Sequence, residues 1–327
     1  MLGLSGLTVT ADEAAFFAAA QPLGFILFAR NVDTPAQVSA LVRDLRNCVG
    51  RDDAPVLIDQ EGGRVARLRP PHWHALPAAA EISNLPDDQA VEAAWLTGRL
   101  IAHDCEGLGI NVACAPTLDV LAPGVKTEVI GDRSYGSDPN RVALLGRAMA
   151  DGLLAGGVLP VAKHIPGHGR AQVDSHFALP TVEAASEVLA AIDFAPFHAL
   201  RDIPLGMTAH IDYSEIDPGV PATWSFKIVE DVIRKQIGFD GFLFSDDLSM
   251  AALGGPLGER ATRSLAAGCD AVLHCNGQMD EMSAVVAATP PLGDSAFARW
   301  QRIPHPKAEP FDAVAGAAAL GRLMAIA

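Results

Sequence analysis

Hydrophobic positions along this chain fall into short apolar runs, each followed by a polar or glycine-rich turn and then by a segment with helical periodicity. Seven runs predict strands, at 24–28, 55–58, 110–115, 158–163, 205–210, 241–244 and 271–273. Helices are predicted after them, at 35–45, 90–105, 139–154, 182–202, 226–237 and 312–327. Because strands and helices alternate, the pattern predicts an α/β fold built on a parallel sheet.

The number of repeating units favours one particular arrangement of that sheet. Seven or eight strand–helix units in 327 residues favour a single (β/α)8 TIM-type barrel over a doubly wound sheet, with residues 1–327 as one catalytic domain. An eighth strand is not obvious in the sequence. Residues 1–9 or the segment after Leu292 could supply it, so we expect an irregular first unit.

Polar side chains gather where the predicted strands end. They are Arg30, Asp59, Lys163, His164, His210, Asp246 and Asn276. The carboxyl ends of the strands form the active face of such a barrel, so these residues are expected to converge there.

Composition and charge exclude several classes of protein. Half of the residues are hydrophobic and 19% are charged, which indicates a globular chain with a large core. The net charge of −15 opposes binding to nucleic acid or to an anionic membrane surface. No apolar run reaches the roughly 18 residues of a membrane span, and residues 1–12 contain no basic leader, so we expect a cytoplasmic protein. Five cysteines without a Cys-x-x-Cys spacing indicate reduced thiols.

The densest chemistry lies between residues 158 and 180, where three of the ten histidines fall within thirteen residues. Asp174 and His176 are two positions apart, and a carboxylate beside an imidazole fixes its tautomer and raises its basicity. This pair is therefore a candidate acid/base unit, although a solvated pair on an ordinary turn is the alternative.

A metal site in the same stretch is not expected. His164, His168, Asp174 and His176 have the chemistry of ligands, but their spacing matches no zinc signature. Pro166 and Gly167 also prevent a helical His-x-x-x-His arrangement.

Asp246 and Asp247 directly follow the strand predicted at 241–244. A carboxylate at this position is suited to act as a nucleophile or a base. Asp is also a common helix cap, so one of the two could cap while the other reacts. The pattern alone does not distinguish them.

Residues 59–67 combine carboxylate, amide and guanidinium groups on a turn that two glycines permit. Such groups recognise hydroxyl-bearing or carboxylate-bearing substrates, and the alternative is an ordinary surface salt bridge. No Gly-x-Gly-x-x-Gly opens a helix here, so a nicotinamide enzyme is not expected. We expect no cofactor.

Several of these segments together resemble a known family. They are Ile26 to Asn31, Asp59 to Val65, Ile130 to Gly136, Lys163 to Gly169 (Lys-His-Ile-Pro-Gly-His-Gly), Asp174 to His176 (Asp-Ser-His), Met207 to His210 and Phe244 to Met250. In this order, over residues 24–277, the chain resembles the family 3 glycoside hydrolases, and among them the cytoplasmic β-N-acetylglucosaminidases of bacterial peptidoglycan recycling.

The resemblance implies a retaining enzyme that removes terminal N-acetylglucosamine from β-1,4-linked peptidoglycan fragments, the N-acetylglucosaminyl-1,6-anhydromuramyl peptides. It implies that Asp246 is the nucleophile, and that His176, paired with Asp174, is the general acid/base. The residues implied to hold the sugar are Asp59, Arg67, Arg133, Lys163 and His164. A phosphorylase of the same family, a catalytically silent muropeptide-binding barrel and a metal-dependent hydrolase are the alternatives.

The chain also departs from the family pattern. Its first apolar segment, at residues 1–6, is shorter than the resemblance leads us to expect, and positions 126–128 read Lys-Thr-Glu where Asn and Pro are expected. The segment after Gly277 has no recognisable counterpart. None of these departures involves a residue implied in the chemistry.

Overall fold

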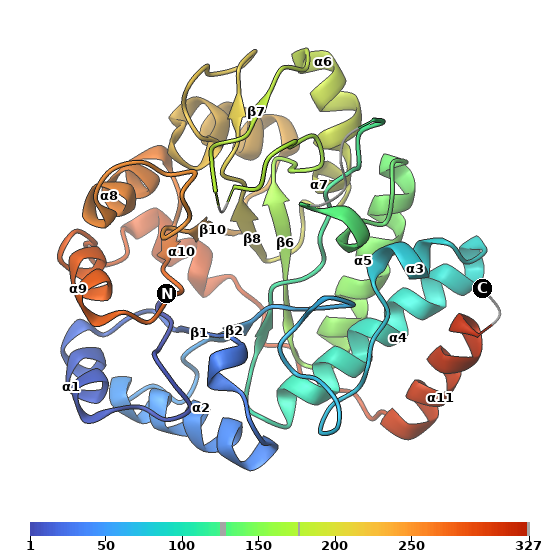
Figure 1. Ribbon diagram of the computed structural model, residues 1–327, viewed down its shortest axis with the longest axis horizontal. Helices are drawn as coiled ribbons and strands as arrows, with labels where there is room; N and C mark the ends of the chain where they lie inside the picture. Colours follow the sequence, from blue (N-terminus) through green and yellow to red (C-terminus); the bar gives the residue numbers. More distant parts are fainter. Residues whose placement is uncertain (125–128, 176, 326–327) are drawn as a thin grey trace.

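The computed structural model describes residues 1–124, 129–175 and 177–325. Its centre is a curled, parallel sheet in which each strand pairs with the next one along the chain (Figure 1). The strands are β1 (Phe25–Leu27), β2 (Val56–Ile58), β5 (Val112–Ala113), β6 (Leu159–Ile165), β8 (Leu205–Thr208), β10 (Phe242–Asp247) and β11 (Ala271–Leu273). The predicted parallel sheet and all seven predicted strands are therefore confirmed.

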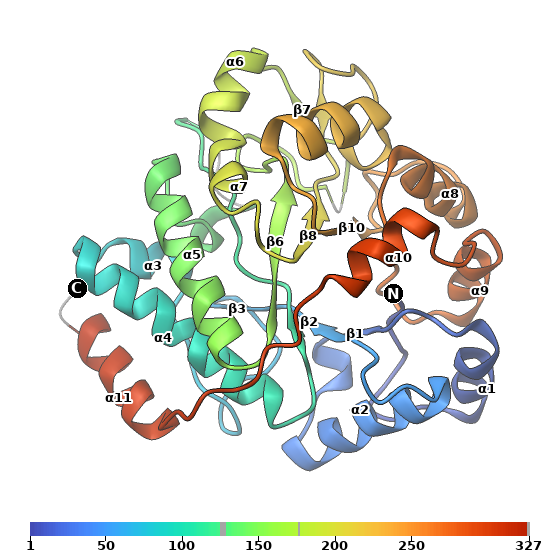
Figure 2. The same cartoon turned by 180° about the vertical axis from the view of Figure 1, so that it is seen from behind.

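Helices surround this sheet (Figure 1). The α-helices are α1 (Ala11–Ala20), α2 (Pro35–Val49), α3 (Ala79–Ser83), α4 (Asp87–Glu106), α5 (Pro139–Ala155), α6 (Ser186–Val188), α7 (Ala195–Ala199), α8 (Leu257–Ala267), α9 (Met279–Ala287), α10 (Asp294–Gln301) and α11 (Ala313–Met324). Two π-helical segments, η3 (Leu189–Asp193) and η5 (Ile228–Ile237), and three short 3-10 segments, η1 (Ala29–Asn31), η2 (Gly131–Arg133) and η4 (Ala222–Trp224), complete them. Figure 2 shows the chain running from α10 to α11, which packs against α4.

Helix α2 illustrates how closely local sequence determines an element. The Oγ1 atom of Thr34 accepts a hydrogen bond from the backbone N–H of Gln37, and Pro35 occupies the first turn, where its missing N–H costs nothing. The predicted apolar face, which includes Val38 and Leu41, is buried against the sheet. The predicted start of this helix is confirmed.

The helix predicted at 182–202 is wrong at its start and in its continuity. Residues Thr181–Val182 form β7, which pairs with β9 (Asp212–Tyr213), a contact between distant segments that local periodicity does not reveal. The helical part begins only at Ser186 and is divided into α6, η3 and α7. Pro196 lies at the start of α7, where its ring and missing N–H interrupt the preceding helical hydrogen bonds.

The two edge strands of the curled sheet both contact the first residues of the chain. Leu2 forms parallel bridges to Phe25 and to His274, and its carbonyl accepts a hydrogen bond from Ile26 N at 3.0 Å. Gly3 N donates to the carbonyl of His274 at 2.8 Å. Of the two candidates for an eighth strand, residues 1–3 thus contact both edge strands, whereas the segment after Leu292 continues into α10.

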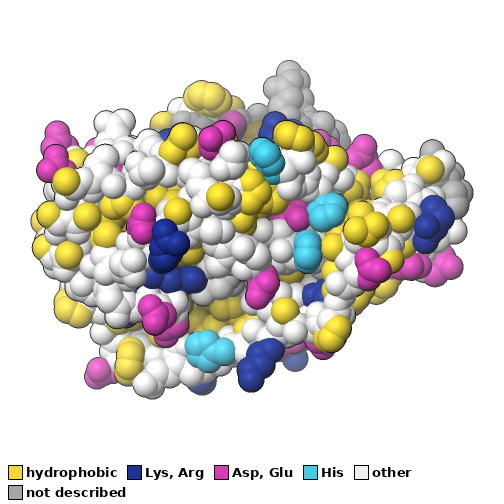
Figure 3. All heavy atoms as spheres, turned by 90° about the horizontal axis from the view of Figure 1, so that it is seen from below, with side chains coloured by type: hydrophobic (Ala, Val, Ile, Leu, Met, Phe, Trp, Pro, Cys, Tyr) yellow, Lys and Arg dark blue, Asp and Glu magenta, His cyan; other side chains and the backbone are white. Residues whose placement is uncertain are grey.

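Apolar side chains fill both sides of the sheet. An inner cluster joins side chains from neighbouring strands, among them Val161, Met207 and Phe242, and a larger cluster lies between the sheet and its helices. On the face seen in Figure 3, acidic, basic and histidine side chains are interspersed rather than gathered by sign. In the described ranges, no helix combines the length and the apolar character needed to cross a membrane.

Gly3 offers a direct test of the contact between the chain start and β11. A Cβ atom on Gly3 would lie 2.3 Å from the backbone oxygen of Cys275, whereas a Cβ on Gly6 would meet no atom within 4 Å. We expect Gly3→Ala to lower the free energy of unfolding by about 1–3 kcal/mol, because a backbone atom cannot yield as a flexible side chain does. Urea denaturation measures the effect, and Gly6→Ala is the matched control. Equal stabilities for the two variants would contradict the described packing.

Candidate active site

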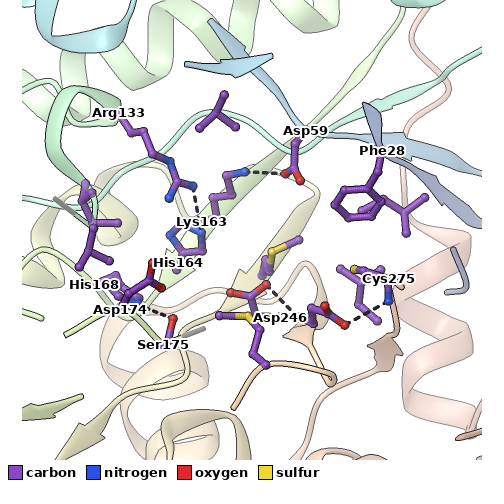
Figure 4. Close-up of a pocket in the computed structure, with 18 of the residues that line it drawn as sticks. Phe28, Asp59, Arg133, Lys163, His164, His168, Asp174, Ser175, Asp246 and Cys275 are labelled. Atoms are coloured by element: carbon purple, nitrogen blue, oxygen red, sulfur yellow. Dashed lines mark hydrogen bonds and ion pairs between the residues drawn. The ribbon is translucent and has the colours of Figure 1, made fainter. Parts of the chain in front are cut away.

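A pocket of about 220 Å³ opens where the central strands end (Figure 4). It brings together seven of the eight residues that the sequence predicted for the site. They are Asp59, Arg67, Arg133, Lys163, His164, Asp174 and Asp246. The eighth, His176, lies outside the described residues.

Parallel strands of the central sheet deliver the central members of this set. Lys163 and His164 belong to β6, Asp246 belongs to β10, and Asp59 directly follows β2. Parallel strands place their carboxyl ends at one edge of the sheet, which brings residues about one hundred positions apart into contact. Arg67 comes from the loop after the short hairpin of β3 (Gln60–Gly62) and β4 (Val65–Ala66).

A network of ion pairs organises one side of the pocket. The buried Nζ atom of Lys163 lies 3.0 Å from Oδ1 of Asp59 and 2.5 Å from Oε1 of Glu61. Arg67 Nη2 lies 3.1 Å from the second oxygen of Asp59. Arg133, at the end of η2, donates from Nε and Nη2 to the two oxygens of Glu61 at 2.9 and 2.8 Å. Three cations thus hold two carboxylates in fixed positions.

Burial and charge act in opposite directions on this network. Burial by itself raises the pKa of Asp59, but Lys163 and Arg67 outweigh it and hold that pKa below its usual range. Glu61 behaves in the same way beside Arg133 and Lys163, so its pKa is also lowered. Burial would lower the pKa of Lys163, yet the two carboxylates raise it above its usual value. All of these groups therefore stay charged at neutral pH.

Glu61 is a site residue to which the sequence interpretation assigned no role. It lies inside the predicted 59–67 segment, but nothing in that segment shows that it bridges Lys163 and Arg133. Phe28 was also missed. Its ring lies beneath the guanidinium of Arg67, at 5.4 Å from the ring centroid, and lines the same pocket. An apolar residue at the end of a strand gives no signal of such a contact.

Asp119 fixes the imidazole of His164. The Nδ1 atom of His164 lies 2.7 Å from Oδ2 of Asp119, which is fully buried. A carboxylate only accepts, so Nδ1 carries a proton, and Nε2 faces Nη2 of Arg133 at 3.5 Å. Burial raises the pKa of Asp119, but the neighbouring His164 outweighs it and the pKa is lowered. The position of Asp119 shortly after a predicted strand was the available signal for it.

Asp246 and Asp247 have different surroundings. The Oδ1 atom of Asp247 accepts from the backbone N–H groups of Ser249 and Cys275, both at 3.1 Å, so this residue holds the turn after β10. Both residues line the pocket, and the carboxylate of Asp246 accepts a hydrogen bond from Asp247 N at 2.8 Å. The two positions that the sequence left open thus differ in their hydrogen bonds, and the assignment of Asp246 as the nucleophile stays a prediction.

The surroundings of Asp246 favour its charged form. Burial raises its pKa, but His210, His164, the N–H of Asp247 and the charge of Lys163 together lower it below the usual value. His210 also supports the same turn, because its Nε2 atom donates to the backbone oxygen of Asp247 at 3.0 Å. An ionised carboxylate that faces a pocket is suited to nucleophilic attack.

Asp174 reaches the pocket from the loop after β6. Its side chain is half-buried and lies near His168 and Ser175 (Figure 4). Its backbone oxygen accepts hydrogen bonds from Phe177 N at 2.9 Å and Ala178 N at 3.1 Å, which form a turn. The predicted pairing of Asp174 with His176 stays a prediction.

In residues 1–124, 129–175 and 177–325, no three His, Cys, Asp or Glu side chains gather in a way that could hold a metal ion.

The sequence and the fold are similar to those of known proteins. The family model described as the glycosyl hydrolase family 3 N terminal domain matches residues 4–294. A beta-hexosaminidase of Alkalilimnicola ehrlichii is 39% identical over 283 residues, which cover 84% of this chain and 80% of that protein. A beta-hexosaminidase of Pseudomonas aeruginosa is 38% identical over 299 residues, covering 89% of this chain and 88% of that protein.

A solved structure resembles the chain over nearly its whole length. NagZ from Neisseria gonorrhoeae, in complex with N-trifluoroacetyl-D-glucosamine, superimposes with a TM-score of 0.89 at 30% sequence identity. The likeness covers 99% of this chain and 97% of that one.

The buried ion network predicts a stability loss that depends on pH. Lys163→Met leaves Asp59 and Glu61 without their shared cation, so we expect a loss of about 3–5 kcal/mol in the free energy of unfolding at neutral pH. Both carboxyls have folded pKa values below their unfolded ones, so they stabilise the fold above the unfolded pKa, and this stabilisation disappears as pH falls through the folded pKa. The deficit of the variant should therefore shrink in acid.

Urea denaturation at several pH values measures this deficit. Lys235→Met is the matched control, since Lys235 is exposed and pairs with Asp231 at 2.9 Å. Its loss should stay within about 0.5 kcal/mol. A similar loss for both variants, or a Lys163→Met deficit that does not change with pH, would contradict the described network.

Proposed function

The chain belongs to glycoside hydrolase family 3 and is a glycosidase, and on this premise we propose that it is a retaining exo-β-N-acetylglucosaminidase. The observation that carries the proposal is the placement of an ionised, pocket-facing Asp246 opposite a fixed cationic network. The beta-hexosaminidase relatives and the bound N-trifluoroacetyl-D-glucosamine of the NagZ neighbour support N-acetylglucosamine as the recognised sugar.

In the first step, a carboxylate oxygen of Asp246 attacks the anomeric carbon and forms a covalent glycosyl–enzyme bond. The bond from that carbon to the glycosidic oxygen breaks, and His176 gives its proton to the departing oxygen. The role of His176 rests on the family resemblance and on the position of Asp174 at the same pocket.

In the second step, His176 removes a proton from water, and the water oxygen attacks the anomeric carbon. The sugar leaves with its original β configuration, and Asp246 is free again. Most retaining glycosidases use two carboxyl groups for these tasks. A neutral imidazole avoids a second negative charge near Asp246, which would raise the pKa of the nucleophile.

The sugar-binding residues would be Asp59, Arg67, Arg133, Lys163 and His164. Arg67 Nε is buried and has no hydrogen-bond partner among the described residues, which leaves a donor for a ligand oxygen. Lys163 and Arg133 are held by carboxylates and would donate to hydroxyl or acetamido oxygens without rearrangement. The pocket, at about 220 Å³, is smaller than the ~300–1,000 Å³ of sites for drug-sized ligands, which suits a single terminal sugar.

The proposal also covers the natural substrate, the cellular location and the architecture of the domain. We propose that the substrates are N-acetylglucosaminyl-1,6-anhydromuramyl peptides of peptidoglycan recycling, handled in the cytoplasm without a cofactor. Residues 1–327 would act as one catalytic domain on a (β/α)8 barrel, and the bridges of Leu2 to both sheet edges support this architecture.

Replacement of Asp246 tests the nucleophile. Asp246→Ala should lower kcat for an aryl N-acetyl-β-glucosaminide by at least about a thousandfold, because no carboxylate then forms the covalent intermediate. Circular dichroism should show an intact fold. Asp280→Asn, an exposed position on α9, should keep full activity. If the Asp246→Ala enzyme kept more than a small fraction of wild-type kcat, Asp246 would not be the nucleophile.

The acceptor and the leaving group require natural substrates. Mass spectrometry of the products from purified muropeptides, in buffers with and without phosphate, should show free N-acetylglucosamine in both. A sugar phosphate that forms only in phosphate buffer would show that the enzyme is a phosphorylase. Tight binding of muropeptides without turnover would indicate a silent binding protein.

A further inference from the structure

Ser175 lies between Asp174 and residue 176 and is tied to two other parts of the molecule. Its side chain is buried, and its Oγ atom lies 3.2 Å from Nε2 of His168 (Figure 4). Its backbone oxygen accepts a hydrogen bond from Ala252 N at 3.0 Å. Ser175 thus joins the far part of the loop after β6 both to the start of that loop, at His168, and to the loop after β10, at Ala252.

The Ala252 anchor belongs to the loop that follows the proposed nucleophile. Ala252 lies six residues after Asp246 and is itself buried. The turn between them is held by the Asp247 carboxylate, which accepts from two backbone N–H groups. The hydrogen bond from Ala252 to Ser175 therefore sets the distance between the loop after β6 and the loop after β10.

The His168 anchor leads back to a sugar-binding residue. His168 N donates to Oδ1 of Asp119 at 2.6 Å, while the other oxygen of Asp119 holds the His164 ring at 2.7 Å. A chain of hydrogen bonds runs from His164 through Asp119 and His168 to Ser175. The buried carboxylate of Asp119 thus holds the His164 ring directly and Ser175 through His168.

The ring of His168 lines the pocket and packs edge-on against the ring of His164. Its ring is buried, and its Nδ1 atom has no partner among the described residues, which costs about 1–3 kcal/mol. Burial, followed by the neighbouring His164, lowers the pKa of His168 to about 4, so the ring is neutral in the working range. A neutral imidazole with one unpaired nitrogen is a poor way to fill a core, but it gives Ser175 a fixed partner.

We propose that Ser175 is a positioning residue, whose hydrogen bonds to His168 and Ala252 hold Asp174 in register with Asp246. This inference rests on the proposed function. Adjacent Cα atoms are a fixed ~3.8 Å apart, so fixing Ser175 restricts the position of Asp174. A displacement of about 1 Å at a reacting group costs on the order of a hundredfold in rate.

The chemistry supplies a readout that general destabilisation does not move. A leaving oxygen of high pKa needs a proton as its bond to the sugar breaks, whereas a dinitrophenolate departs without one. If Ser175 positions Asp174, the proposed partner of the proton donor, its loss harms only substrates with poor leaving groups. A merely structural role would lower the rates of all substrates together.

The test compares Ser175→Ala with wild type on aryl N-acetyl-β-glucosaminides that span good and poor leaving groups. We expect kcat/KM to stay within about threefold for the dinitrophenyl glycoside and to fall roughly 10–100-fold for the phenyl glycoside. The dependence of log kcat/KM on leaving-group pKa should become steeper. Ser283→Ala, an exposed serine on α9, is the matched control and should reproduce the wild-type dependence.

A second pair of variants guards against misfolding of Ser175→Ala. His168→Leu removes the ring nitrogen and should give the same steeper dependence of log kcat/KM on leaving-group pKa. His168→Gln keeps a hydrogen-bonding atom near Ser175 Oγ and should recover much of the lost kcat/KM on the phenyl glycoside. An unchanged dependence in both Ser175→Ala and His168→Leu, or an equal fall for every leaving group, would overturn the positioning role.

Failure of the proposed function would look different. A wild-type enzyme that releases no N-acetylglucosamine, or an Asp246→Ala variant that still turns over, would contradict the proposed chemistry. An active wild type that depends on Asp246, with Ser175 variants of normal leaving-group dependence, would contradict only the positioning role.

Discussion

The ammonium group of Lys163, buried between Asp59 and Glu61, is the interaction on which the site depends. A buried charge costs several kcal/mol unless it is paired, so each charged group lowers the free-energy cost of burying its partners. Because Asp59 follows β2, Glu61 lies in β3 and Lys163 lies in β6, the pairing also joins strands that are distant in sequence. The arginines that complete it bring two further loops, at Arg67 and Arg133, to the same pocket.

A third carboxylate, the fully buried Asp119, orders the other half of the pocket. It orients the His164 ring and holds the backbone of His168, from which the hydrogen-bond chain reaches Ser175. One half of the pocket thus presents fixed donors to a ligand, and the other half presents Asp174 and Asp246. Preorganisation of this kind lets donors act on a transition state without reorganisation, which is how such sites accelerate reactions.

Much of this arrangement is predictable from sequence, and the exceptions have physical causes. Strands and polar strand ends were found because apolar runs ending in Asp59, Lys163 and Asp246 are local patterns. The break in the helix predicted at 182–202 depends on the pairing of β7 with β9, which no local window contains. Glu61 and Asp119 were missed as site residues because their importance lies in partners forty or more positions away. The geometry of the Asp174 and His176 pair stays a prediction.

The central claim is that Asp246 becomes covalently attached to the sugar during turnover. Rapid quenching of the enzyme with an activated aryl N-acetyl-β-glucosaminide, followed by proteolysis and mass spectrometry of the peptides, tests it most directly. The account predicts one N-acetylhexosaminyl group on the peptide that contains Asp246, and its loss in Asp246→Ala. A sugar attached to a different residue, with the peptide of Asp246 unmodified, would contradict it.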